Sequence, residues 1–403
     1  MTGLPLQGSK VPPTTDLDPF CDSFLSDPYR FHASLRGLGP VFRLSTYGIF
    51  GMARYAEVYA ALNDWQGFCS SRGVGMSDFA REQPWRPPSL LLETDPPIHD
   101  RTRAVVRRVI SRQKLATLRP RWTNKARELV DRLVEVRQFD AIHDLAEVYP
   151  LSVFPDAVGL RPDGRENLLP YGSLAFNSFG PLNHLVIEAR KATGPVSEWV
   201  AASCRSESLA PEGFGAALYE AADEGEITHD EAERLVRSFL SAGVDTTVNG
   251  LGNAIHCFLE HPEQWSRLRD DPRLIVTAFE EVLRFSSTAQ TFFRTTTRDI
   301  GVGDLVIPEG QKVLLFLAAA NRDPLRWNEP EMFDIGRKTS GHVGFGAGIH
   351  ACVGQAIARM EAELILGALA ERVVRIEPAG PVRRRLNNTL YAWENLPVRV
   401  IPG

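Results

Sequence analysis

The sequence lacks most of the features that place a chain outside the ordinary globular proteins. No run approaches the roughly 18 apolar residues that span a bilayer; the longest, Val313–Ala320, has the length of a strand. The N-terminus shows no basic segment followed by an apolar one, so we expect neither secretion nor a membrane anchor. Cysteines are few, odd in number and never spaced as C-x-x-C, which disfavours disulfide scaffolds and zinc ribbons and favours a cytoplasmic location. They are Cys21, Cys69, Cys204, Cys257 and Cys352.

The chain also lacks a large excess of charge of either sign. The 403 residues carry 45 Lys+Arg against 50 Asp+Glu, a net charge of −5, and no basic stripe dominates, which argues against a nucleic-acid binder. The run Arg383–Arg385 is short, and we interpret it as a solvated face. A composition of 43% hydrophobic and 24% charged residues is that of a soluble globular chain rather than a disordered or fibrous one.

Periodicity predicts a mainly helical chain with small β-sheets. We expect a flexible Pro/Thr/Gly-rich arm over residues 1–15 and one large domain over 16–403, because the informative motifs are far apart yet suit a single site. Helices are predicted over 54–64, 99–112, 119–136, much of 167–206, 228–259, within 262–285 (two helices) and over 353–374. A hairpin is predicted over 42–54, and strands over 292–297, 305–307 and 312–317. Residues 70–97 lack periodicity, and we interpret them as a functional loop.

The stretch Phe345–Gly354 (FGAGIHACVG) crowds glycines before a helix that begins near Cys352. A helix start favours negative charge and lowers a thiol pKa, and a thiolate is a suitable ligand for haem iron. Three other interpretations remain. Gly346-x-Gly348-x-x-Ala351 matches a dinucleotide fingerprint, but the preceding residues 339–343 do not resemble a strand. A nucleophilic cysteine lacks an evident base, and a buried structural cysteine leaves the glycines unexplained.

Residues 345–354 resemble, position by position, the haem-binding signature of the cytochrome P-450 superfamily, F-G-x-G-x-[HR]-x-C-x-G. The resemblance implies the fold of that family, a single large domain around a buried haem b (iron protoporphyrin IX). It also implies that Cys352 is the iron ligand, with Phe345 and Gly354 beside the cofactor.

Further motifs of the family follow in the expected order. Glu281-x-x-Arg284 resembles the family's E-x-x-R, and Arg337 would complete that charge network. Ala242-Gly-Val-Asp-Thr246 resembles the oxygen-activation motif, which implies that Asp245 and Thr246 deliver protons to dioxygen. The alternative is that a back-bonded threonine merely bends the helix.

Anchors for the haem propionates are implied at four positions. His99 and Arg103 are spaced as the family's H-x-x-x-R and share one helix face. Arg294 and His350 occupy two further anchoring positions of the family.

The helix that carries Thr246 also carries Ser238 and Ser241, with Arg237 adjacent, and the irregular loop contributes Arg86 and Ser89. Together these residues suit a carboxylate, while phenylalanines 176, 179, 292 and 293 suit a flat ring; the alternative is that they only satisfy backbone groups and fill the core. Stretches such as Pro84–Leu90 and Gln290–Thr297 resemble the bacterial branch that oxidises para-substituted benzoates such as 4-methoxybenzoate, by hydroxylation or O-demethylation.

The resemblance implies a haem-thiolate monooxygenase that uses dioxygen and a small aromatic carboxylate. Electrons are expected from a separate ferredoxin fed by an NADH-dependent ferredoxin reductase, since the sequence contains no flavin or ferredoxin segment. Two alternatives stay open: a haem-thiolate peroxygenase that runs on hydrogen peroxide, and a haem protein that only binds a gas.

Overall fold

The computed structural model describes residues 11–403, and helices dominate it. They are α1 Asp22–Ser26, α2 Tyr29–Gly37, α3 Tyr55–Asn63, α4 Ile98–Val109, α5 Arg112–Val136, α6 Val148–Val158, α7 Leu168–Asn177, α8 His184–Ala192, α9 Gly194–Ser203, α10 Phe214–Asp223, α11 His229–Ala242, α12 Asp245–Glu260, α13 Pro262–Asp270, α14 Ile275–Phe285, α15 Leu317–Asn321 and α16 Gln355–Arg372. Within the described residues, no helix combines the length and the apolar character that crossing a bilayer requires.

The strands are short. They are β1 Thr14–Thr15, β2 Phe42–Leu44, β3 Ile49–Met52, β4 Phe68–Cys69, β5 Gln138–Asp140, β6 Thr291–Thr296, β7 Ile300–Val302, β8 Leu305–Ile307, β9 Lys312–Phe316, β10 Val373–Pro378, β11 Arg383–Arg385, β12 Ala392–Asn395 and β13 Pro397–Pro402. The largest sheet has the order β1-β2-β3-β9-β6-β4, so N-terminal strands pair with strands from the last third of the chain.

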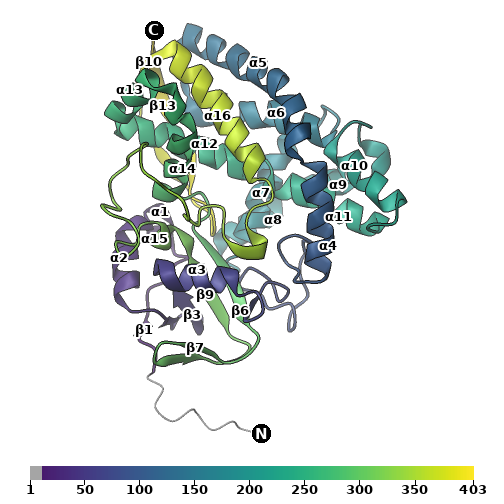
Figure 1. The fold of residues 1–403 in the computed structure, drawn as a ribbon, viewed down its shortest axis with the longest axis vertical. Coiled ribbons are helices and arrows are strands. Elements are labelled where there is room, and N and C mark those ends of the chain that lie inside the picture. Colours follow the sequence, from purple (N-terminus) through teal and green to yellow (C-terminus); the bar gives the residue numbers. More distant parts are fainter. Residues whose placement is uncertain (1–10) are drawn as a thin grey trace.

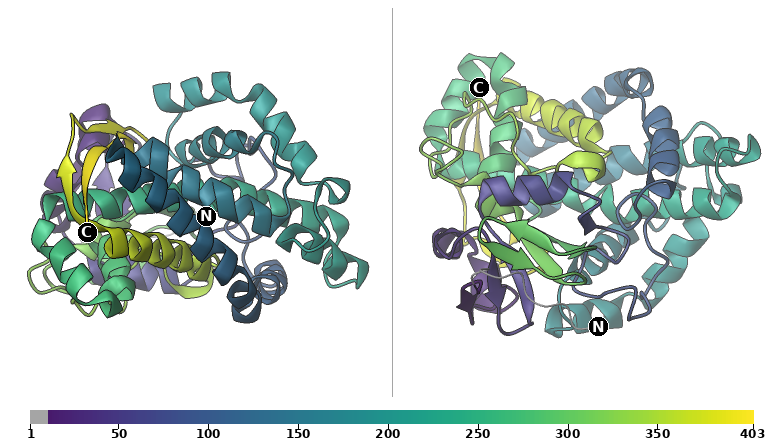
Figure 2. Two further views of the ribbon diagram at one scale, coloured as in Figure 1. Left: turned by 90° about the horizontal axis from the view of Figure 1, so that it is seen from above. Right: turned by 60° about the horizontal axis from the view of Figure 1, so that its bottom comes forward.

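Two layers follow from this topology. Figure 1 shows the helices in the upper part of the view and the main sheet in the lower part, next to α1 and α2. The right-hand view of Figure 2 brings the sheet forward, with the green strands of the segment 291–316 beside the purple N-terminal elements. Helix α12 crosses the helical part, and twelve of its sixteen residues are buried, which explains its largely apolar and small-residue composition. The site described below lies between the two layers.

Most predicted elements are present, with three differences. The helix expected over 228–259 is two helices, α11 and α12, separated at Gly243 and Val244. The capping box Thr228–Glu231 at its start is present. The apolar run Val313–Ala320 is divided between β9 and α15. Of the arm expected over 1–15, residues 1–10 lie outside the described residues, and Thr14–Thr15 form β1, which pairs with β2. The division of the chain at residue 15 stays a prediction.

Candidate active site

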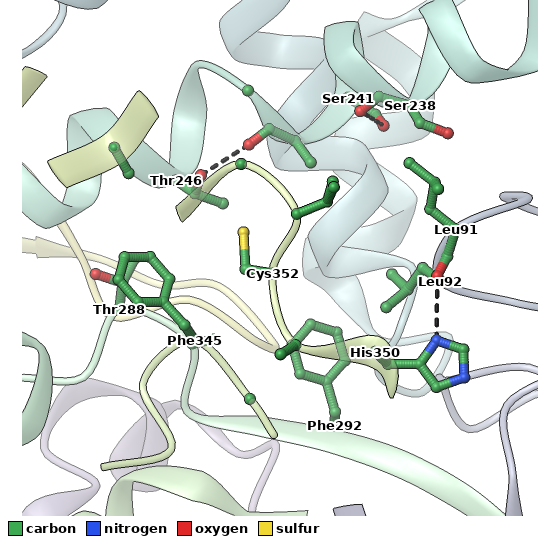
Figure 3. Close-up of a pocket in the computed structure, with 18 of the residues that line it drawn as sticks. Leu91, Leu92, Ser238, Ser241, Thr246, Thr288, Phe292, Phe345, His350 and Cys352 are labelled. Atoms are coloured by element: carbon green, nitrogen blue, oxygen red, sulfur yellow. Dashed lines mark hydrogen bonds between the residues drawn. The ribbon is translucent and has the colours of Figure 1, made fainter. Parts of the chain in front are cut away.

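One cavity collects nearly all the sequence-predicted functional residues. Its wall is formed by the loop before α4, by α7, by the junction of α11 and α12, by β6 and by the Cys352 loop. Figure 3 shows the sulfur of Cys352 pointing into this cavity, with Thr246 above it and Phe345 beside it, while Ser238 and Ser241 lie farther along the wall. We call residues 345–354 with His99, Arg103 and Arg294 the cysteine end. The serine end consists of Arg86, Ser89, Ser238 and Ser241.

Glycines determine the path of the Cys352 loop. Gly346 and Gly348 have φ angles of +70° and +67°, in the left-handed region that other residues rarely adopt. A Cβ atom at Gly348 would also lie 2.3 Å from the carbonyl oxygen of Leu62 in α3. The loop closes when the backbone N–H of Cys352 donates to the carbonyl of Phe345 at 2.8 Å. The motif glycines are therefore required by conformation and by close packing.

The expectation of a low thiol pKa at this helix start is wrong for the chain's own groups. Burial raises the pKa of the Cys352 thiol and outweighs the N–H groups of Gly354 and Gln355 and the charges of Arg103 and Arg359, which lower it. The N–H groups and arginines therefore favour a thiolate without producing one. A coordinated metal cation would complete the ionisation, since metal ligation deprotonates a thiol outright.

The cysteine end fits a flat group that bears carboxylates. Nε of Arg103 is buried with no hydrogen-bond partner among residues 11–403. Within the same residues, Arg294 faces the cavity with only the Phe293 carbonyl as its hydrogen-bond acceptor; burial lowers its pKa to about 10, and Asp95 offsets part of that effect. His99 is not among the lining residues, and its Nδ1 atom already pairs with Oδ1 of Asp100 at 3.1 Å. Buried arginines without anions are costly, so a ligand with two carboxylates, as haem has, suits Arg103 and Arg294.

His350 is less available than the sequence suggested. Its Nδ1 atom lies 3.1 Å from the carbonyl oxygen of Leu91 (Figure 3), and its Nε2 atom lies 3.4 Å from Oδ1 of Asp95. Asp95 also accepts hydrogen bonds from the N–H groups of Ser70 and Ser71. His350 thereby connects the cysteine end to the loop that covers the cavity.

The break between α11 and α12 places Thr246 at the cavity. A Cβ atom at Gly243 would lie 2.2 Å from the Phe154 ring, so the packing of the bend against this ring favours glycine. The hydroxyl of Thr246 donates to the carbonyl of Ala242 at 2.7 Å, as Figure 3 shows. The threonine thus back-bonds at a bend while its side chain lines the cavity, and its part in proton delivery stays a prediction.

Asp245 is buried behind Thr246 and turns away from the cavity. Its Oδ1 atom accepts from Nη2 of Arg385 at 2.8 Å and from Nδ2 of Asn249 at 3.3 Å, while Oδ2 is buried and has no partner within residues 11–403. Arg385 is 29% exposed, so this ion pair joins the buried carboxylate to the surface.

The interpretation of Arg383–Arg385 as a solvated face is therefore wrong for two of its three residues. Arg385 pairs with Asp245, and Arg384 lies over the rings of Tyr391 and Trp393, with its Cζ atom 3.3 Å and 4.3 Å from their centroids. Only Arg383 has an exposed side chain, because β11 turns its neighbours toward α12 and β12.

The charge network behind the cysteine end is present as predicted. Arg284 is fully buried and forms a bidentate pair with Glu281 at 2.7 and 2.8 Å, and Nε of Arg337 lies 3.2 Å from Glu281 Oε1. Arg284 also donates to the carbonyls of Asn321, Pro330 and Met332. The network thus fixes the irregular segment that precedes the Cys352 loop.

At the serine end the hydroxyl groups contact one another and the backbone. Oγ of Ser89 lies 3.1 Å from Oγ of Ser238, which donates to the Arg234 carbonyl, and Ser241 donates to the Ser238 carbonyl. Arg86 lines the same wall. Arg237 does not belong to the described cavity wall; it pairs with Glu233 on its own helix at 2.9 Å.

Aromatic rings form the wall between the two ends. Phe176 and Phe179 near the end of α7 and Phe292 on β6 line the cavity and contact one another, with centroids 5.7 and 5.6 Å apart. Phe293 does not line it: successive strand residues face opposite sides, and Phe293 stacks on Phe20 in the core below the sheet.

Sequence reasoning missed the partners that hold these residues, above all Arg385 and Glu93. Glu93 is buried and binds both Arg86 and the backbone of Ser89. The position of Glu93 four residues after Ser89 was a sequence signal for a capped turn. Nothing in the sequence indicated the partner of Arg385, which lies in a basic run.

The chain is similar to known proteins over almost its whole length. The family model described as Cytochrome P450 matches residues 202–388. The chain is 54% identical over 400 residues to "Cytochrome p450 CYP199A2" of Rhodopseudomonas palustris, covering 99% of this chain and 97% of the relative. It is 31% identical to the vitamin D(3) 25-hydroxylase of Pseudonocardia autotrophica, covering 88% and 89%.

Solved structures are similar over almost the whole fold. Cytochrome P450 CYP109Q5 from Chondromyces apiculatus has a TM-score of 0.80 at 30% identity, covering 95% of this chain and 97% of that one. Cytochrome P450 CREJ in complex with (4-ethylphenyl) dihydrogen phosphate has a TM-score of 0.86 at 25% identity, covering 95% and 99%.

Proposed function

Because the chain belongs to the cytochrome P450 family of haem b monooxygenases, we propose that it oxidises a small aromatic carboxylic acid, a para-substituted benzoate such as 4-methoxybenzoate. The observation that carries the proposal is the single cluster of Arg86, Ser89 and Ser238 in a cavity whose other wall is aromatic. Such an arrangement binds a carboxylate at one end of a flat ring and leaves the para position free to face Cys352.

Each of the chain's residues has a stated part in this proposal. Cys352 would hold the haem iron, and His99, Arg103 and Arg294 would bind its propionates. Arg86 and the serine hydroxyls hold the substrate carboxylate. Phe176, Phe179 and Phe292 enclose the ring and exclude water. The tight apolar wall limits the substrate to one orientation, which determines the position oxidised.

The haem, when bound, supplies the oxidising chemistry by which one oxygen atom of dioxygen enters the para substituent while the other leaves as water, with two electrons and two protons. A methoxy group so oxidised becomes a hemiacetal, which breaks down to a phenol and formaldehyde. Asp245 takes protons from the Arg385 side, and the Thr246 hydroxyl passes them into the cavity. Electrons come from a separate ferredoxin and its NADH-dependent reductase, and the enzyme acts in the cytoplasm.

Two features of similar proteins support the substrate class. The stretches that resemble the benzoate-oxidising branch include both the loop with Arg86 and the strand with Phe292. The similar protein CREJ is described with (4-ethylphenyl) dihydrogen phosphate, an aromatic ring with an anionic group opposite an alkyl group.

The test compares 4-methoxybenzoate with its neutral analogue 4-methoxybenzamide on the ferric protein. We expect the acid to change the spin state, seen in the Soret band, at concentrations well below those the amide requires. Turnover with a ferredoxin and reductase should then yield 4-hydroxybenzoate and formaldehyde, and 3-methoxybenzoate should serve as the matched control that binds without efficient demethylation. Equal shifts by acid and amide would show that the carboxylate site is wrongly assigned.

A further inference from the structure

A buried carboxylate lies directly behind the serine end. Glu93 is 4% exposed, and its Oε2 atom accepts hydrogen bonds from Nη1 of Arg86 at 2.8 Å and from the N–H of Ser89 at 2.7 Å. One oxygen atom therefore holds two of the groups that would receive the substrate. Leu91 and Leu92 of the same turn lie on the cavity wall (Figure 3).

The bond to Glu93 determines which edge of Arg86 is free. Nη1 is fully engaged, because it donates to the Pro87 carbonyl as well as to Glu93, whereas Nε is buried with no partner in the part of the chain that the structure describes. A guanidinium held by Nη1 presents its Nε and Nη2 edge, the edge that binds a carboxylate with two parallel hydrogen bonds.

The neighbouring serine hydroxyl groups increase the importance of the Nε and Nη2 edge of Arg86 for binding a carboxylate. Ser238 and Ser241 already donate to backbone carbonyls, and Ser89 shares its hydroxyl contact with Ser238. A bound carboxylate must redirect these protons, whereas buried Nε of Arg86 has no existing hydrogen bond among the described residues to exchange. The position of Arg86 therefore decides whether an anion is recognised.

Glu93 has a simpler role that must be separated from this one. Oγ of Ser89 accepts from the N–H groups of Leu91 and Leu92 at 3.4 and 3.3 Å, and the carboxylate of Glu93 returns to the Ser89 N–H, as in a helix capping box. If Glu93 only stabilised this turn, its loss would weaken the binding of every ligand equally. If it acted only through its charge, its removal would strengthen the binding of acids, because it repels them.

We propose that Glu93 is a positioning residue for substrate recognition, which holds Arg86 and Ser89 in the geometry that selects an aromatic carboxylate over a neutral analogue. The inference rests on the proposed function, since it assumes that the serine end receives the carboxylate. Glu93 does not touch the substrate in this proposal, and its hold on Arg86 and Ser89 is the physical cause of the selectivity.

Two substitutions separate position from charge in the haem-loaded protein. Glu93→Gln removes the charge but keeps an oxygen at the same reach, so the affinity for 4-methoxybenzoate should stay within about threefold of the wild type or increase. Glu93→Asp keeps the charge but withdraws the oxygen by one methylene, so the affinity for the acid should fall about tenfold while that for 4-methoxybenzamide changes less than twofold. Isothermal titration calorimetry measures both ligands independently of turnover.

Arg86→Gln provides the test of mechanism, because it keeps a donor for Glu93 and removes the free Nε. If Glu93 acts through Arg86, adding Glu93→Asp to Arg86→Gln should lower acid affinity less than about twofold further. Equal losses for acid and amide in Glu93→Asp, or a loss in Glu93→Gln as large as in Glu93→Asp, would overturn the proposal. A wild-type protein that binds acid and amide equally would instead refute the proposed function, whatever the variants do.

Discussion

The two ends of the cavity use similar polar groups but leave them in opposite states. At the cysteine end, neither Arg103 nor Arg294 pairs with a carboxylate among the described residues, and Nε of Arg103 has no hydrogen-bond partner there. At the serine end, Ser238 and Ser241 donate to backbone carbonyls, and Arg86 already pairs with Glu93, which leaves only its Nε atom without a partner in the same residues. The cations of the first end lack an anion, whereas the cation of the second end already has one.

This difference predicts two kinds of binding. Unpartnered buried donors make the cysteine end unfavourable until an anionic group reaches them, so it should bind its cofactor tightly and permanently. The serine end must exchange existing hydrogen bonds for new ones, so each contact contributes little and the substrate can leave. Substitutions should therefore change ligand binding strongly at the cysteine end and weakly at the serine end.

The largest effect is expected from Cys352→Ala. The variant loses the only side chain of the 345–354 loop that can supply a thiolate, so turnover should disappear. The reduced protein under carbon monoxide should lose the absorption maximum typical of sulfur ligation. Cys257→Ala, at a buried core cysteine, is the matched control and should keep both. A Cys352→Ala variant that kept this absorption would remove the basis for the assignment of the iron ligand.

The next largest effect is on stability: Arg284→Ala should lower the free energy of unfolding. The substitution leaves the Glu281 carboxylate buried and removes hydrogen bonds to three carbonyls, and breaking such a buried pair costs about 3–5 kcal/mol. Arg372→Ala removes an ion pair with Asp131 in which both side chains are about half exposed, and should cost less than about 1 kcal/mol. Denaturant unfolding measures both, and equal losses would show that the network is not what holds the loop.

The contrast between the two ends also decides what the sequence could predict. The Cys352 loop was predictable because its constraints are local: Gly346 and Gly348 need positive φ angles, and Glu281 and Arg284 share one helical turn. The motif Ala242–Thr246 indicated a bend for the same local reason, whereas the full separation into α11 and α12 and the close packing of Gly243 on Phe154, which is distant in sequence, were not predictable.

Partners of the site residues were unpredictable for the same reason. Arg385 lies 140 residues from Asp245, and nothing in a run of three arginines indicates which one turns inward. Phe292 lines the cavity and Phe293 does not, because the register of β6 determines which face of the sheet each side chain occupies.

Thr246→Ala tests the cavity between the two ends. Without this hydroxyl, proton delivery beside the cysteine end should fail more often, and product formed per electron consumed should fall about tenfold while hydrogen peroxide rises. Thr247→Ala, a neighbour on the same cavity wall, is the control. Unchanged product yield in Thr246→Ala would favour peroxygenase chemistry or mere gas binding over a proton relay.

Acid stability tests a charge cluster outside the cavity that supports the cysteine end. Burial alone would raise the pKa of Glu280, but hydrogen bonds from His342 and Arg359 outweigh it and lower the pKa to about 2. A lowered carboxyl pKa stabilises the fold fully above the ordinary value near 4.5, and this stability is lost as the pH falls through about 2.

Glu280→Gln should therefore lower the unfolding free energy near neutral pH by about 1 kcal/mol and flatten its decline between pH 4.5 and 3. Glu371→Gln, at a surface pair with Arg127, is the control and should change neither. Thermal or denaturant unfolding at several pH values measures the slope, and an unaltered slope in Glu280→Gln would mean that this carboxyl does not link acid to unfolding.

The smallest effect is expected at the serine end, from Ser238→Ala. The hydroxyl of Ser238 already donates to the Arg234 carbonyl, so a substrate carboxylate gains from it only what exchanging that bond allows, about 0.5–1 kcal/mol or a two- to fivefold change in affinity. Ser241→Ala, whose hydroxyl donates to the Ser238 carbonyl, should behave alike. Calorimetric titration with 4-methoxybenzoate measures both variants. A loss greater than about thirtyfold in either would show that the hydroxyl is free to turn toward the ligand, and the two ends of the cavity would then bind their ligands by the same principle.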